Sequence, residues 1–241
     1  MSITLFGTCR INPILNNNQL NNAINYPHST KEVIQQIKFL LGEKEIPAPF
    51  DIFCFRTGIL YKSPISYSED FRTKFTESNI CVVEICSSKK YICNNEYYLH
   101  HLAVDTRPDG CYYNGTPQCV LDHYQCVQQS DEEIEKDILE IRTLLEPREL
   151  VFVSHYNAQL NGDYLASRKK LIILLIHICT KHNIRLIQPS EVLRGHPQME
   201  VLTDDLGHYT ELGISKFTDF MNLYLADIQE KETQLDTSEL K

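Results

Sequence analysis

The strongest constraint on the fold of this chain is that short apolar segments alternate with helix-like segments along its length. Four apolar segments, each bounded by turn-forming or polar residues, have the length and composition of buried strands: 3–6, 80–86, 150–154 and 184–187. Strands that alternate with helices are typical of a parallel sheet that is covered on both faces. We therefore expect an α/β fold, a three-layer α/β/α sandwich with a central parallel sheet, in a single domain over residues 1–241.

Two capping boxes mark helix starts, because Ser29 stands three residues before Glu32 and Ser130 three residues before Glu133. Apolar spacing predicts helices over 30–41, 68–78, 131–145, from Asp163 or Tyr164 to 182, and 210–228. The remaining segments are predicted as an asparagine-rich loop (11–26), a short strand or packed turn (50–60), an insertion that caps the site (91–129) and a flexible tail (229–241).

Composition narrows the functional classes. The net charge of -9 argues against nucleic acid as a partner, because phosphate binding requires a basic surface. The longest apolar run, 171–179, is too short to span a membrane, and no signal peptide is visible, so we expect a cytoplasmic protein. The chain has no glycine-rich phosphate loop, and we expect no cofactor. Nothing in the sequence indicates the oligomeric state.

The chain has nine cysteines, an odd number, and most of them lie in apolar settings that favour reduced thiols. Cys111, Cys119 and Cys126, with His123 between the last two, raise the hypothesis of a zinc site. Their spacing lacks the close C-x2-C pair that makes such an assignment specific. We therefore expect no metal.

Four turns follow the predicted strands or precede the last helix: 7–10, 86–90, 154–157 and 205–208. The carboxyl ends of parallel strands meet at one edge of a sheet, which is where ligands bind in such folds. Cys9 is a candidate nucleophile in the first turn, and Asp205, three residues before His208, can orient that imidazole. Glu84, inside the second strand, is either bonded to a nearby amide or base or serves as a pocket acid.

These residues resemble the SGNH superfamily, also called GDSL-type hydrolases. In that family a serine follows, by two residues, the glycine that ends the first strand, and here Cys9 stands at that distance from Gly7. The family's last block is D-x-x-H before the closing helix, which Asp205 and His208 match. The resemblance implies a flavodoxin-like fold and a mechanism in which Cys9 attacks an ester carbonyl, His208 accepts its proton and Asp205 orients His208.

The two middle blocks of the family match less closely. The resemblance assigns oxyanion donors to Asn157 and to the amides of Cys9 and Ser87, although the family's Gly-x-Asn-Asp motif is absent. Thr8, whose hydroxyl precedes the thiol, is the alternative nucleophile. Arg10 and His155 are candidates for binding the substrate, or are satisfied locally.

We therefore expect an esterase or acyl hydrolase that acts on a small acylated or carbohydrate-type substrate through a Cys- or Thr-His-Asp triad. One alternative is a cysteine-dependent acyltransferase in glycan modification. Another is a catalytically reduced relative that binds ligands but has lost the serine, in which Cys9 is only a small buried hydrophobic residue.

Overall fold

The computed structural model describes residues 2–16, 20–104 and 116–239. Its centre is a five-stranded sheet in the order β10-β7-β3-β1-β2, in which every neighbouring pair is parallel. The strands are β1 (Ile3–Gly7), β2 (Leu20–Asn25), β3 (Ile80–Ile85), β7 (Glu149–Ser154) and β10 (Arg185–Ile187). Counted along the sheet this is the flavodoxin-like order, which confirms the predicted α/β sandwich.

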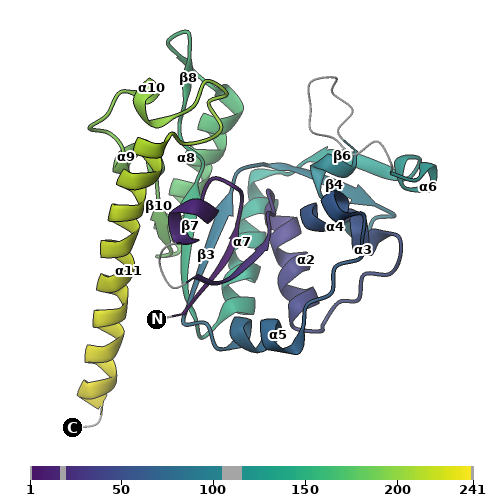
Figure 1. Ribbon diagram of the computed structural model, residues 1–241, viewed down its shortest axis with the longest axis horizontal. Helices are drawn as coiled ribbons and strands as arrows, with labels where there is room; N and C mark the ends of the chain where they lie inside the picture. The colour runs from purple at the N-terminus through teal and green to yellow at the C-terminus, as the bar shows by residue number, and fades with distance from the viewer. Residues whose placement is uncertain (1, 17–19, 105–115, 240–241) are drawn as a thin grey trace.

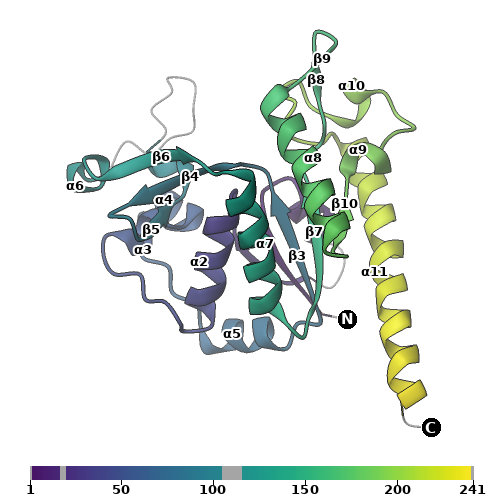
Figure 2. The same ribbon diagram turned by 180° about the vertical axis from the view of Figure 1, so that it is seen from behind.

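Helices cover both faces of the sheet (Figures 1 and 2). One face carries α2 (Thr30–Leu40), α5 (Glu69–Thr76), α7 (Asp131–Leu145) and α8 (Ala166–Lys181). The other carries α1 (Asn12–Asn16), α9 (Pro189–Val192), α10 (Gln198–Val201) and α11 (Glu211–Glu239). Neighbouring residues of β1 divide between the two cores, since Leu5 packs on the α11 side and Phe6 on the α2 side.

A smaller antiparallel sheet stands beside the main one (Figure 1). It consists of β4 (Lys89–Cys93), β5 (Tyr97–Leu99) and β6 (Tyr124–Gln128) in the order β5-β4-β6. It shares a third apolar core with the short helices α3 (Phe50–Phe53), α4 (Arg56–Tyr61) and α6 (Gln118–Leu121). The predicted insertion is therefore a packed unit with its own core. Its role as a cap stays a prediction, and Cys111 lies outside the described residues.

Four local predictions were wrong. Segment 11–26 contains α1 and the edge strand β2, because pairing with β1 outweighs the local preference of asparagine for turns. Segment 50–60 forms α3 and α4. The α8 helix begins at Ala166, because a hairpin of β8 (Gln159–Leu160) and β9 (Asp163–Tyr164) precedes it. The last helix, α11, continues to Glu239, past the end predicted at residue 228.

Both capping boxes were predicted correctly. The Ser29 side chain accepts a hydrogen bond from the Glu32 amide at the start of α2, and Ser130 accepts one from the Glu133 amide at the start of α7. Each satisfies an amide that has no partner within its helix. Among the described residues, no helix is both long enough and apolar enough to cross a membrane.

Candidate active site

The turn that follows the first strand and the turn that precedes the last helix meet at the carboxyl edge of the sheet. β1 ends at Gly7, and the next residues turn into α1, with the amides of Ile11 and Asn12 bonded to the Thr8 carbonyl. His208 lies in the turn that leads into α11, which packs against α1 and β1. This packing places Cys9 Sγ 3.2 Å from His208 Nε2, within hydrogen-bonding range for sulfur.

Asp205 holds the other side of the imidazole. Its Oδ2 lies 2.5 Å from His208 Nδ1, and its Oδ1 accepts hydrogen bonds from the Thr203 hydroxyl and from the amides of Gly207 and His208. Partial burial raises the pKa of Asp205, but these hydrogen bonds outweigh burial and hold that pKa below its ordinary value. The carboxylate is therefore charged and fixed in place, and Cys9, His208 and Asp205 form one hydrogen-bonded chain.

The turn around Asp205 has a strained backbone. Leu206 lies in the left-handed region with φ 54°, which is uncommon for a bulky residue. This conformation lets both following amides reach one carboxylate oxygen. Strain of this kind persists where the surrounding structure holds a functional group in place.

Glu84 holds the turn over residues 7–10 in place by bonding to the residues on either side of Cys9. It is 1% exposed, and its Oε2 accepts hydrogen bonds from the Thr8 amide at 2.7 Å and the Thr8 hydroxyl at 2.5 Å. Its Oε1 accepts from Arg10 Nε at 3.0 Å. Burial alone would lower the pKa of Arg10, but the charge of Glu84 outweighs burial and leaves that pKa above its ordinary value. The two side chains therefore form a salt bridge. The interpretation of Glu84 as an acid bonded to an amide and a base is confirmed.

Thr8 is not placed to act as a nucleophile. Its side chain is buried, and its hydroxyl donates to Glu84 rather than facing the histidine. Cys9 is the neighbouring residue whose side chain contacts His208. The geometry therefore favours the thiol over the hydroxyl.

The predicted oxyanion donors differ in which hydrogen-bonding partners they already have. The Ser87 amide donates to the His28 carbonyl at 2.9 Å, as the Cys86 amide does at 3.1 Å, and its role as an oxyanion donor stays a prediction. The Asn157 backbone amide donates to Ser190 Oγ at 2.7 Å, and its side-chain oxygen is buried without a partner. The roles of the Asn157 side chain and of the Cys9 amide stay predictions.

Three of the predicted site residues carry a buried polar atom without a hydrogen-bonding partner: Arg10 Nη2, His155 Nδ1 and Asn157 Oδ1. Burial and the nearby charges of Arg10 and Arg168 lower the pKa of His155 well below its ordinary value, so its ring is neutral. Buried polar groups are normally paired. Unpaired ones near a candidate nucleophile are expected where a ligand completes the hydrogen bonding.

One of these residues, His155, lines a cavity of about 260 Å³. Its lining includes Ser87, Lys89, His155 and Arg168. Sequence reasoning missed Arg168, whose Nη1 donates to the carbonyl of Leu206 at 2.6 Å and to that of Tyr156 at 3.4 Å. Arg168 lies in the first turn of α8, where a positive charge is unfavourable because of the helix dipole. This unfavourable placement was the feature of the sequence that could have indicated a functional role.

The sheet order and the Cys9–His208–Asp205 chain at its carboxyl edge define the class: an SGNH-type α/β domain with cysteine in the position of the serine. Within that class the chain belongs to the family of the TviD N-terminal domain, whose model matches residues 1–109 and 103–222.

Among curated proteins, the Vi polysaccharide biosynthesis protein TviD of Salmonella typhi is 26% identical over 255 residues. The match covers 88% of this chain but only 30% of that protein, so the chain spans less than a third of its relative. Two solved structures are similar over most of their length. The lipase/acylhydrolase from Enterococcus faecalis has a TM-score of 0.42 at 11% identity, covering 93% of this chain and 95% of its own. The Clostridium thermocellum family 3 carbohydrate esterase has a TM-score of 0.48 at 10% identity, with coverages of 96% and 98%.

Proposed function

We propose that this domain is an acyl-modifying enzyme that acts on a carbohydrate substrate through a thioester on Cys9. The observation that carries the proposal is the contact of 3.2 Å between Cys9 Sγ and His208 Nε2, with Asp205 on the far side of the ring. A thiol, a base and a carboxylate in this order are the parts that covalent acyl transfer requires.

In the first half of the reaction, the Cys9 thiol transfers its proton to His208 Nε2 as sulfur attacks the acyl carbon of the ester. Asp205 keeps the proton on His208 Nδ1, so that Nε2 is free to accept. The tetrahedral intermediate collapses when the alkoxide leaves and takes the proton from His208 Nε2. The products of this half are the free alcohol and an acyl-thioester on Cys9.

In the second half, an acceptor hydroxyl gives its proton to His208 and attacks the thioester carbonyl. The Cys9 thiolate leaves and takes the proton back from His208, so the products are the acylated acceptor and the free thiol. Water as the acceptor gives an esterase, and a sugar hydroxyl gives an acyltransferase. The family relationship supports a carbohydrate acceptor or donor, because the relative is named a polysaccharide biosynthesis protein. The cavity that His155 lines also has Lys89 and Arg168 in its lining, which offer hydrogen-bond donors for a polar substrate.

Turnover of p-nitrophenyl acetate, with and without an added oligosaccharide acceptor, tests the proposal. We expect an initial burst of p-nitrophenol, acetyl on Cys9 by mass spectrometry, and a loss of at least about 100-fold in Cys9→Ala and His208→Ala. Cys119→Ala is the matched control, because Cys119 is an exposed thiol away from the candidate site. Turnover that survives in Cys9→Ala, or no acylation of Cys9 by any ester of a panel, would contradict the proposal and favour a binding role.

A further inference from the structure

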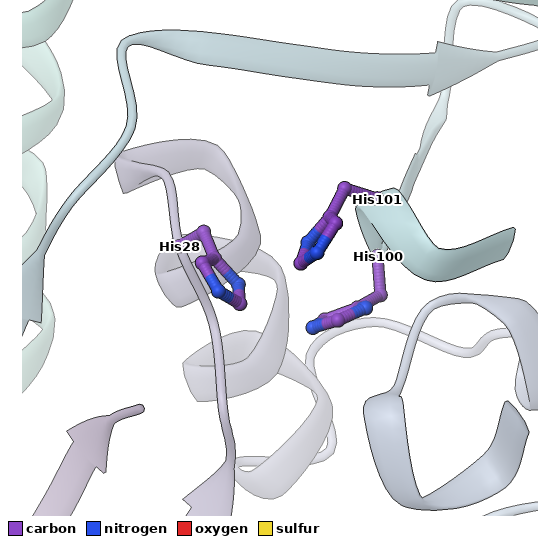
Figure 3. Close-up of side chains that lie close together, drawn as sticks. All are labelled: His28, His100 and His101. Carbon is purple, nitrogen blue, oxygen red and sulfur yellow. The ribbon is translucent and has the colours of Figure 1, made fainter. Parts of the chain in front are cut away.

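His28 and the consecutive histidines His100 and His101 gather at the junction between the main domain and the insertion (Figure 3). His28 lies in the loop between β2 and α2, and His100 and His101 lie where β5 leads into the short 3-10 helix η1 (His101–Ala103). Ring centroids are 4.9 Å apart for His28 and His100, and 4.4 Å apart for each of the other two pairs. No acidic side chain belongs to this cluster.

Ordinary packing leaves this cluster with an unsatisfied polar core. His100 is fully buried and its Nε2 has no hydrogen-bonding partner, and His28 Nδ1 is also buried without one. A buried ring nitrogen without a partner destabilises the fold, and two in one cluster indicate a missing ligand.

The geometry is close to that of a metal site. One ligand atom from each histidine lies within 4.8 Å of the other two. In a tetrahedral zinc site with bonds of about 2.0–2.1 Å, the nitrogens are about 3.3 Å apart. On binding an ion, the three nitrogens would have to approach one another to reach that separation. Among the described residues this is the one group of three or more potential ligands that is assembled closely enough to hold an ion.

The donor set selects the kind of ion. Imidazole nitrogens without carboxylates suit first-row transition metals and exclude the hard cations Mg²⁺ and Ca²⁺. Arg10 and Arg56 contribute positive charge near His28, so the affinity of the site has to come from the three nitrogens. Three protein nitrogens leave the fourth tetrahedral position open.

We propose that His28, His100 and His101 bind one divalent transition-metal ion, with Zn²⁺ as the ion to test. The ion would connect the insertion, through His100 and His101, to the loop between β2 and α2, through His28. The His28 carbonyl accepts the amides of Cys86 and Ser87, which follow β3 at the same sheet edge as Cys9. A fixed His28 would therefore hold the floor of the neighbouring cavity in place. This inference is independent of the proposed acyl chemistry.

Cobalt(II) titration tests the site, because tetrahedral Co²⁺ gives visible d–d bands and thiolate ligands add a near-ultraviolet charge-transfer band. The protein is prepared without a histidine tag and as Cys9→Ala, because Cys9 and His208 form a second pair that can bind metal. We expect d–d bands that saturate at one equivalent, no sulfur charge-transfer band, and displacement of Co²⁺ by Zn²⁺. Zn²⁺ should also raise the melting temperature of this protein.

His28→Gln and His101→Gln should each weaken Co²⁺ binding by about 100-fold or more, whereas His177→Gln, an exposed histidine on α8, should leave it unchanged. Circular dichroism establishes that each variant is folded. If a cluster variant does not fold, the folded Cys9→Ala protein alone decides the question through its bands and its melting temperature. Absence of d–d bands in that protein, a sulfur charge-transfer band, or full binding in folded His101→Gln would overturn the proposal.

Discussion

Cys9 differs from the buried thiols of this protein in its surroundings. Cys81 and Cys179 are buried among apolar side chains, and burial raises the pKa of each to about 12, so they stay protonated and inert. Cys9 is only partly buried and contacts a histidine that is itself held by a carboxylate. This contact argues against the interpretation of Cys9 as a small hydrophobic residue.

The residue Asp205 should matter for both rate and acid stability. In Asp205→Asn no carboxylate remains to hold the proton on His208 Nδ1, and we expect kcat/KM to fall by about 100-fold or more.

The same carboxylate should contribute to stability in a pH-dependent way. Because the pKa of Asp205 is lowered in the folded protein, its carboxylate stabilises the fold above the unfolded pKa of about 4, and this contribution is lost as the pH falls through the folded pKa. The melting temperature of the wild type should therefore exceed that of Asp205→Asn at pH 7, and the difference should narrow as the pH falls below about 4. A gap that stays constant with pH would contradict this.

Thr8→Val separates the two candidate nucleophiles. The substitution removes the hydroxyl that donates to Glu84 but leaves the Thr8 amide bonded to it. We expect a loss of stability of about 1–3 kcal/mol in denaturant unfolding, because a buried carboxylate oxygen loses a partner. Acylation of Cys9 by p-nitrophenyl acetate should persist. Acylation that disappears in a folded Thr8→Val protein would instead point to the hydroxyl.

Among the secondary structure elements, α11 positions the base. Gly213, in its first turn, lies so close to α10 that an added Cβ would collide with the Val201 carbonyl oxygen. Gly213→Ala should therefore move the helix start and the preceding His208 turn, with a loss of stability of about 1–3 kcal/mol and a lower rate of Cys9 acylation. Gly195→Ala is the control, since nothing lies near its Cβ. Equal unfolding midpoints for the two variants would show that α10 and α11 separate without cost.

Elements with local signals were predictable. Capping boxes and apolar spacing identified α2 and α7, and the turn residues around the D-x-x-H motif identified the start of α11. The β2 strand was not predictable in this way, because its stability comes from parallel pairing with β1 rather than from its asparagine-rich sequence. The same limit applies to the site. Its first and last blocks are local motifs, whereas the Glu84–Arg10 pair and the histidine cluster exist only after folding.

At the scale of the whole molecule, the apolar face of α11 closes one side of the sandwich. Phe217, Met221, Leu225 and Ile228 are buried in the same core as the first strand. Each such side chain contributes about 1.5–3 kcal/mol, so together they rival the stability of an ordinary domain. A chain that stops after Glu230 should keep a cooperative melting transition, and one that stops after Leu212 should lose it. Cooperative melting of the shorter chain by calorimetry would contradict this account of the core.

The central claim is that His208 activates Cys9, and the rate of alkylation by iodoacetamide measures that activation most directly. Cys119 and Cys126 are exposed thiols without such a partner and serve as references within the same molecule. Peptide mass spectrometry at pH 6–7 should show Cys9 reacting at least about 10-fold faster than either reference, with the advantage lost in His208→Ala. An alkylation rate for Cys9 that is no faster than the references, or that is unchanged in His208→Ala, would contradict the account.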